Sequence, residues 1–274
     1  MIQSLTPQIF IYSALPCEAK PLVEHFDLKK DTSISPFAMY FNKQICLTVT
    51  GLGKNAMSAG VAYSQALFGS NNDTVMVNIG IAGHQSHQLG RFFLIDKIID
   101  ADTGRHFYPP LVVTPTCSTA GIQSASKPQL NYDQQYLCDM ESSAFYETAT
   151  RFSSAELVHC LKIISDNKHL PAENIQAKHV SLLITEHLTT IETILSSLNL
   201  LAISIALPEP SQFAPLIERY RFTASEQGQL KNLLSRWDTL TEHRALEFDQ
   251  SKLQKGKDVL VWLNRQINEL ECWV

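Results

Sequence analysis

Apolar residues cluster along the first two-thirds of the chain in short blocks, separated by glycines, prolines and polar residues. Blocks of this length that carry few charges predict buried strands. The predicted strands are residues 8–15, 37–41, 44–50, 74–81, 92–100, 111–114 and 157–165. Asn42 and Lys43 form a polar turn between the second and third of these strands, which predicts a hairpin.

Helices are predicted where apolar residues recur every three or four positions, or where small residues dominate. The predicted helices are residues 17–26, 55–68, 140–152 and 171–200. Because helices alternate with strands, we expect an α/β fold with a mixed, largely parallel central sheet flanked by helices.

The pattern changes at Pro208, where three prolines within eight residues indicate a linker. Two amphipathic helices are predicted after it, at residues 225–237 and 251–270. We therefore expect an α/β domain at residues 1–207 and a C-terminal helical extension at residues 208–274. The apolar faces of these helices indicate packing within their own domain, with a lid over a site or a subunit contact as alternatives.

Composition narrows the class of protein. Hydrophobic residues make up 45% and charged residues 18% of the 274 positions, which is typical of a globular chain with a core. The net charge of −5 is spread out and no basic block appears, so we expect no nucleic-acid partner. Neither the six cysteines nor the nine histidines have zinc-ligand spacing, so we expect no metal.

The sequence also bears on location. The first 15 residues, MIQSLTPQIFIYSAL, lack the basic and small-residue features of a signal peptide. The apolar stretch at residues 198–207 is too short to span a bilayer. We therefore expect a cytoplasmic protein without a membrane partner.

Candidate chemistry lies at predicted strand ends, where open α/β sheets bind ligands. Glu18 follows the first strand; the structural alternative is a charge that stabilises a helix start. The turn Gly51-Leu52-Gly53 lets a ligand approach backbone N–H groups, or is only a structural turn. It also fits a loose dinucleotide pattern, but Asp73 precedes the next strand instead of ending it, which argues against that cofactor.

Two more carboxylates follow later strands. Glu141 lies at the start of a predicted helix, where it either caps the helix or accepts hydrogen bonds from a vicinal diol. Asp166 ends the apolar strand at residues 157–165. A buried carboxyl group holds its proton tightly and can donate it to a leaving group, whereas an Asx-type turn is the structural alternative.

Five segments occur in an order that resembles the nucleoside phosphorylase/nucleosidase superfamily, most of all its methylthioadenosine/S-adenosylhomocysteine nucleosidases. They are ALPCEAKPL (14–22), TGLGKNA (50–56), VNIGIAGH (77–84), DMESSA (139–144) and ISDN (164–167). The resemblance covers residues 8–200, and the DMES and ISDN pair is its most specific part. The GIAG run is also similar to futalosine hydrolases.

The resemblance implies a role for each matching residue. Asp166 would protonate or hydrogen-bond N7 of a purine, which eases departure of the base. Met140 would pack on the sugar, and Glu141 would bind its 2′- and 3′-hydroxyls more strongly in the transition state. Glu18 would activate the attacking water, and Lys162 stands where the nucleosidases carry an Arg near that water.

The resemblance also indicates further substrate-binding positions. They are Leu52, Gly53, Ile81, Ala82, Gly83 and Ile122. Ile122 lies in the segment where the family carries an aromatic residue that stacks on the base, and an aliphatic side chain stacks less well.

Hydrolysis is favoured over phosphorolysis because the phosphorylases bind phosphate through an Arg and a Ser in the segment that here reads VNIGIAG, where Asn78 and Ile81 stand. Lys20, Lys54 and Arg105 remain as candidate phosphate ligands. We therefore expect a purine nucleosidase without a cofactor, acting as a symmetric dimer. The alternatives are a phosphate-dependent purine nucleoside phosphorylase and a non-catalytic nucleoside-binding protein, the latter suggested by Ile81 and Ile122.

Overall fold

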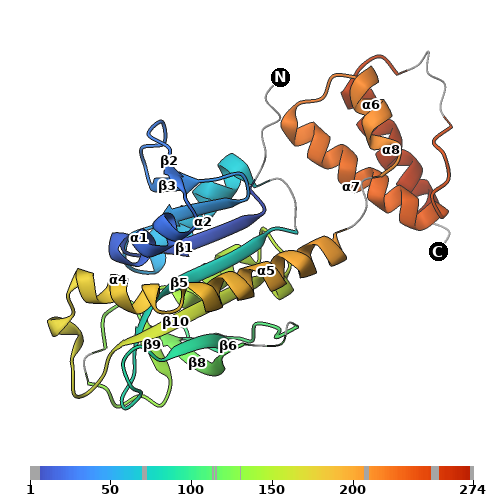
Figure 1. Ribbon diagram of the computed structural model, residues 1–274. Coiled ribbons are helices and arrows are strands. Elements are labelled where there is room, and N and C mark those ends of the chain that lie inside the picture. Colours follow the sequence, from blue (N-terminus) through green and yellow to red (C-terminus); the bar gives the residue numbers. More distant parts are fainter. Residues whose placement is uncertain are drawn as a thin grey trace. The chain divides into compact units, whose positions relative to one another are not determined.

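The computed structural model describes residues 7–69, 73–112, 114, 116–129, 131–206, 210–247 and 253–271. It divides the chain into two compact units, Met1–Ala206 and Leu207–Val274. The first unit combines a sheet with helices, and the described part of the second unit is helical (Figure 1).

One mixed sheet runs through the first unit. Its strands are β1 (Ile9–Ser13), β2 (Lys29–Lys30), β3 (Ala38–Phe41), β4 (Ile45–Val49), β5 (Val75–Gly83), β6 (Phe92–Asp100), β7 (His106–Phe107), β8 (Ser118–Ser124), β9 (Leu137–Asp139) and β10 (Val158–Asp166). The longest ladders are parallel and join β5 to β10 and β6 to β8. Because β10, β6, β8 and β9 lead back to β5, these five strands close into a ring.

Helices cover both faces of the sheet because its central strands are apolar on both sides. In β1, Ile9 and Ile11 belong to one core, and Phe10 and Tyr12 belong to the other. The first core is covered by α1 (Pro16–His25), α4 (Ala177–Thr185) and α5 (Leu188–Ile205). The second core is covered by α2 (Lys54–Phe68) and α3 (Ser142–Ala149). Short 3₁₀ turns, η1 (Ala155–Leu157) and η2 (Ala172–Asn174), complete the unit.

The predicted α/β class, the mixed and largely parallel sheet and the hairpin formed by β3 and β4 are confirmed. Two predicted elements are wrong. The described residues 111, 112 and 114 form no strand; prolines flank this segment and lack the N–H that a ladder needs. The single helix predicted at residues 171–200 is replaced by η2, α4 and α5. The chain turns at His187, whose Nε2 bonds the Gly90 carbonyl at 2.6 Å.

Among the described helices, α5 alone is long and apolar enough to cross a membrane by length and composition. Its apolar stretch is therefore longer than residues 198–207 indicated. Ile191, Ile194, Leu195 and Leu198 of this helix are buried in the first core. The same composition therefore also fits a helix that covers a sheet.

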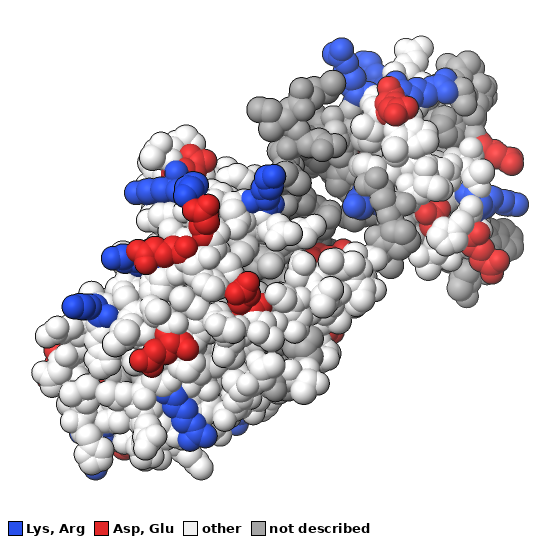
Figure 2. Space-filling view, viewed as in Figure 1, with Lys and Arg blue, Asp and Glu red and all other residues white. Residues whose placement is uncertain are grey.

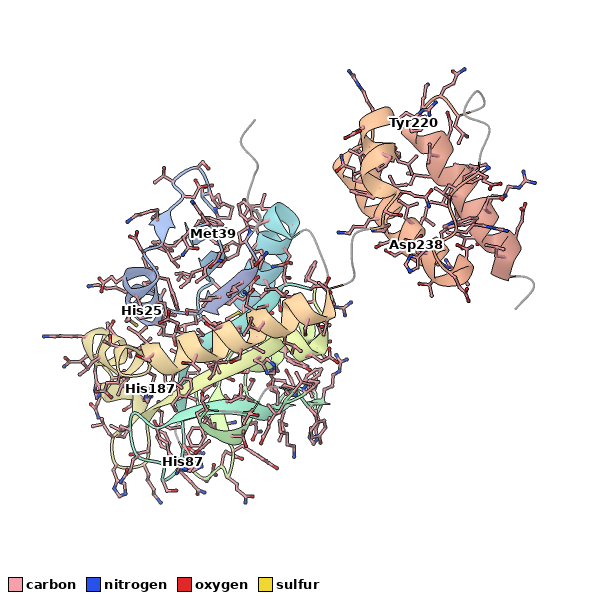
Figure 3. All side chains as sticks on the ribbon, turned by 45° about the vertical axis from the view of Figure 1, so that its right-hand side comes forward. His25, Met39, His87, His187, Tyr220 and Asp238 are labelled. Carbon is pink, nitrogen blue, oxygen red and sulfur yellow. The ribbon has the colours of Figure 1, made fainter. Side chains whose placement is uncertain are left out.

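The second unit has its own core. It contains α6 (Phe213–Arg219), α7 (Ala224–Thr241) and α8 (Gly256–Glu271). The apolar faces identified from the sequence pack against one another and against α6, as the burial of Leu230, Leu234 and Leu263 shows. Tyr220 and Asp238 lie within this unit (Figure 3). The helix α6 was not predicted because Pro215 resembles a linker residue, although proline is tolerated in a first helical turn.

Candidate functional site

A cavity of about 460 Å³ lies at the carboxyl ends of β1, β5 and β10 and at the starts of α1 and α3. Parallel strands end at the same edge of a sheet, so residues distant in sequence meet there. The predicted site residues that line the cavity are Glu18, Leu52, Ile81, Ala82, Gly83, Met140, Glu141 and Asp166. A larger hollow of about 550 Å³ between α7 and α8 contains none of them.

Glu18 is fixed at the floor of the cavity by backbone amides. Its Oε2 accepts a hydrogen bond from the N–H of Leu15 at 2.8 Å, and its Oε1 accepts one from the N–H of Ile81 at 2.9 Å. Glu18 therefore stabilises the start of α1 and lines the cavity at the same time. Burial raises the pKa of this carboxyl group, although the nearby Lys162 and the amides oppose the shift. A Cβ at Gly80 would lie 2.8 Å from Oε1, so a larger residue there would displace this carboxylate.

Asp166 is held by two hydroxyl groups. The hydroxyl of Tyr132 donates a hydrogen bond to its Oδ2 at 2.7 Å, and the hydroxyl of Ser165 donates one to its Oδ1. The adjacent Asn167, not Asp166, makes the Asx-type turn, because its Oδ1 accepts the N–H groups of the two residues at 169 and 170. Gly83 leaves room for the carboxylate, since a Cβ there would lie 2.5 Å from Oδ2.

Glu141 precedes α3, but its side chain makes no capping hydrogen bond. Its Oε1 instead accepts the N–H of Gly53 at 2.7 Å, across 88 positions of sequence. Gly53 itself has a φ of 91°, a conformation that favours glycine. Burial, and then the negative charge of Asp139, raise the pKa of Glu141 to about 7. Met140 lies beside it in the cavity wall.

Lys162 lies below these carboxylates as a fully buried cation. Its Nζ is 2.9 Å from Oδ2 of Asp139. Burial alone would lower the pKa of the ammonium group, but Asp139 and Glu141 raise it above its ordinary value. Asp139 also caps α3 by accepting the N–H and the hydroxyl of Ser142, and its pKa is lowered by Lys162 despite burial. Lys162 therefore lies beneath the site and does not line the cavity.

The described wall of this cavity offers no basic side chain that could bind an anion. Within the part of the chain that the structure describes, no Lys, Arg or His lines it. Lys54 binds Asp100 and Asp102, Arg105 binds Glu147, and Lys20 lies on the surface near Glu24. On the face in Figure 2, the Lys and Arg side chains of the first unit are scattered among carboxylates. The sequence-based suggestion that these three cations could reach a phosphate is wrong.

The prediction that Ile122 contacts a base is also wrong. Its side chain is fully buried in the second core and does not line the cavity. The register of β8 decides this, because successive side chains of a strand point to opposite faces. Ile81 contributes its backbone N–H to Glu18, and Asn78 is buried with its Nδ2 donating to the carbonyl of Tyr12.

The sequence did not predict several residues that line the cavity. They are Pro128, Gln129, Ala172, Ile175, Ala177 and Val180, and they form an apolar wall with one amide. Tyr132 and Asp139, which orient Asp166 and Lys162, were also missed. Asp139 stands in the DMESSA segment and was within reach of sequence reasoning, whereas the loop that carries Tyr132 has no recognisable pattern. Among the described residues, no group of Asp, Glu, Cys and His could hold a metal ion.

No protein-family model and no curated protein matches the chain by sequence. Solved structures match by fold. The 5′-methylthioadenosine nucleosidase of Arabidopsis thaliana is 16% identical, with a TM-score of 0.58 over 71% of this chain and 96% of that one. A variant of the nucleosidase MTAN of Chlamydia trachomatis is 19% identical, with a TM-score of 0.54 over 70% and 99%. A futalosine hydrolase mutant of Helicobacter pylori is 10% identical, with a TM-score of 0.53 over 69% and 99%.

These similarities concern the fold, because all three identities are low. They confirm the predicted resemblance at that level: the chain has the fold of the nucleoside phosphorylase/nucleosidase superfamily, as seen in methylthioadenosine/S-adenosylhomocysteine nucleosidases. The matches span nearly the whole of each known chain and about seven-tenths of this one.

Proposed function

We propose that this chain hydrolyses the N-glycosidic bond of a purine nucleoside of the methylthioadenosine/S-adenosylhomocysteine type. The observation that carries the proposal is that Glu18, Glu141 and Asp166, which come from three distant segments, line one cavity. The fold of known nucleosidases supports the same class of chemistry.

In the proposed reaction, the bond between the sugar and the base breaks as the sugar becomes oxocarbenium-like. Asp166 donates a proton or a hydrogen bond to N7 of the purine, so that the base does not leave as an anion. The hydroxyl groups of Tyr132 and Ser165 keep its carboxyl group oriented toward the cavity.

Glu18 and Glu141 act on the other side of the bond. Glu18 accepts a proton from the attacking water; its raised pKa makes it a stronger base than an exposed glutamate. Glu141 accepts hydrogen bonds from the 2′- and 3′-hydroxyls, with Gly53 holding one of its oxygens. Met140 lies against the sugar.

Water is the proposed acceptor in place of phosphate. A phosphate dianion needs cationic or several N–H partners, and the described cavity wall has no basic side chain. Burying a dianion beside Glu18 and Glu141 would add electrostatic repulsion. A symmetric dimer is part of the proposal, and light scattering on the purified protein would test it.

The test is base release from methylthioadenosine, S-adenosylhomocysteine, adenosine and inosine, each with and without phosphate. We expect release that does not depend on phosphate. Release only with phosphate would make the protein a phosphorylase. Binding of a nucleoside without release of base would support the non-catalytic alternative and overturn the proposal.

A further inference from the structure

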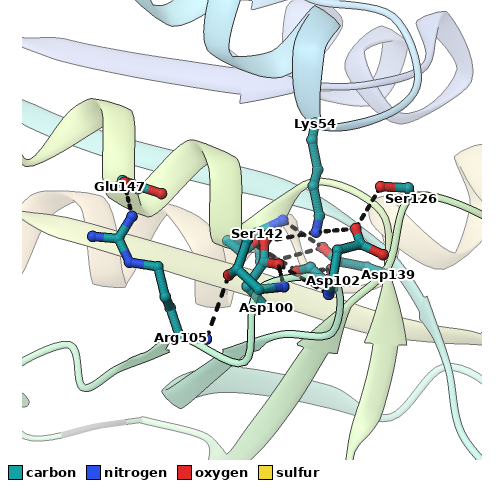
Figure 4. A network of polar contacts seen from close by, with 11 residues as sticks. Lys54, Asp100, Asp102, Arg105, Ser126, Asp139, Ser142 and Glu147 are labelled. Atoms are coloured by element: carbon teal, nitrogen blue, oxygen red, sulfur yellow. Dashed lines mark hydrogen bonds and ion pairs between the residues drawn. The ribbon is translucent and has the colours of Figure 1, made fainter.

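A second polar network lies beside the cavity, at the start of α2 (Figure 4). The Nζ of Lys54 is 2.6 Å from Oδ2 of Asp100 and 2.6 Å from Oδ2 of Asp102. The side chains of Lys54 and Asp100 are mostly buried, at 16% and 11% exposed, whereas Asp102 is about half exposed. Because the Lys54–Asp100 pair is largely buried, water and salt screen its attraction less than that of the surface ion pairs elsewhere in the chain.

Asp100 is anchored independently of Lys54. Its Oδ1 accepts the N–H groups of Asp102 and Thr103 at 3.1 and 2.9 Å. Its Oδ2 also accepts the hydroxyl of Ser143 at 2.7 Å. Ser143 lies in the first turn of α3, two residues after Glu141. Asp100 therefore joins the start of α2 to the start of α3.

The segment before Lys54 needs such an anchor. Gly53 donates its N–H to Oε1 of Glu141, and both Gly51 and Gly53 have φ near 90°. A Cβ at Gly53 would meet no atom within 4 Å. Backbone hydrogen bonds hold the two ends of the turn, from the N–H of Gly51 to the carbonyl of Ala14 and from the N–H of Met57 to the carbonyl of Gly53, both at 3.0 Å. Glycines have many accessible conformations, and Lys54 is the first residue of α2 after this turn.

We propose that Lys54 is a positioning residue that holds Gly53 against Glu141 and thereby sets the preference of the site for a sugar with a 2′-hydroxyl. The inference rests on the proposed function, because it assigns Glu141 to the sugar diol. Oε1 accepts the N–H of Gly53, and Oε2, which accepts the N–H of Met140 at 3.3 Å, has acceptor capacity left for the sugar. Without Lys54, the turn moves and the carboxylate loses its fixed orientation.

Lys54 and Asp100 both stay charged near neutral pH. Burial would lower the pKa of Lys54, but the hydrogen bonds that it donates to Asp100 and Asp102 raise it above its ordinary value. Burial would raise the pKa of Asp100, but Lys54 and Ser143 hold it well below its usual range. The charges of Lys54 and Asp100 should therefore not change near neutral pH, so any pH dependence of sugar binding in that range comes from Glu141.

The test compares adenosine with 2′-deoxyadenosine as substrates of the full-length protein. In Lys54→Met, we expect kcat/KM for adenosine to fall about tenfold or more, with a lower kcat as well as a higher KM, because an oriented hydrogen bond to a charged group that strengthens in the transition state is lost. The value for 2′-deoxyadenosine should fall much less. Lys29→Met is the matched control, since Lys29 pairs with Asp27 on the surface, and it should leave both values unchanged. Equal losses for both nucleosides in Lys54→Met would overturn the proposal.

A second variant separates positioning from stability. Lys54→Met leaves Asp100 buried without its cation, which lowers stability. Lys54→Met combined with Asp100→Asn removes that charge, so its melting temperature should recover while the weakened discrimination remains. If the melting temperature and the discrimination between the two nucleosides both recovered, Lys54 would act only on stability.

A third measurement does not depend on activity. Amide hydrogen exchange at Gly53 should become faster in Lys54→Met and stay unchanged in Lys29→Met. If the wild-type protein cleaves no nucleoside, the proposed function fails, while this exchange still reports on the contact between Gly53 and Glu141. Unchanged exchange in Lys54→Met would overturn the positioning role itself.

Discussion

Glu18, Glu141 and Asp166 carry the same functional group in three different surroundings. Backbone amides hold Glu18, two amides and a buried negative charge surround Glu141, and two hydroxyl groups hold Asp166. The surroundings of Glu18 and Glu141 raise the pKa of each carboxyl group, whereas Asp166 is distinguished by the two hydroxyl groups that orient it.

The role of Asp166 leads to a direct prediction. In Asp166→Asn, we expect base release to fall about 10²- to 10⁴-fold, since the amide cannot donate a carboxyl proton. The substitution preserves shape, so circular dichroism and the melting temperature should stay close to the wild type. Activity equal to that of the wild type would remove Asp166 as the acid.

Glu141 should make nucleoside binding depend on pH. Its pKa is raised to about 7, so the carboxyl group is protonated below that value and loses capacity to accept hydrogen bonds from the diol. Affinity for adenosine should therefore weaken as the pH falls through about 7, measured by calorimetry between about pH 5 and pH 8. Glu141→Gln should remove this dependence and Glu18→Gln should keep it; the reverse pattern would assign the titration to Glu18.

At the scale of the element, β5 serves both as a central strand and as a wall of the site. Apart from Asn78, the first half of the strand is apolar and fills the two cores, whereas its last residues, Ile81, Ala82 and Gly83, line the cavity. Glycines at positions 80 and 83 let the carboxylates of Glu18 and Asp166 approach the backbone. The end of the strand is therefore shaped by close approach and not by strand propensity.

Gly83→Ala should disturb the site more than the fold. The added Cβ would lie 2.5 Å from Oδ2 of Asp166 and must displace that carboxylate, so base release should fall at least about tenfold. Gly228→Ala is the control, because its Cβ would meet nothing within 4 Å in α7; it should keep activity and stabilise the helix by up to about 1 kcal/mol. Unchanged activity in Gly83→Ala would show that the site tolerates the shift.

At the scale of the whole molecule, each unit has its own hydrophobic core, and the candidate site lies within the first unit. All three tryptophans, at positions 237, 262 and 273, belong to the second unit. Tryptophan fluorescence therefore reports on the second unit, and nucleoside turnover reports on the first.

We predict that the two units unfold separately. In urea, loss of tryptophan fluorescence and loss of base release should have different midpoints, because separate cores do not enforce one cooperative transition. A nucleoside bound to the site should raise only the midpoint for turnover. Coincident midpoints that both shift with the nucleoside would show that the units unfold as one.

The sequence by itself determined most of the strands, the presence of helices between them and the positions of the three carboxylates after strands. It could do so because apolar runs, glycine turns and strand boundaries are local features. The sequence did not predict the break in the helix at His187, because a hydrogen bond to the distant Gly90 carbonyl holds that residue.

Only the tertiary structure decided which side chains share the cavity. The register of β8 places Ile122 in a core, and the closing of β9 onto β5 sets Asp139 beside Lys162. Tyr132 reaches Asp166 across 34 positions of sequence. These contacts depend on strand pairing and loop closure between distant segments, and a shift of one residue in pairing reverses the face that a side chain occupies.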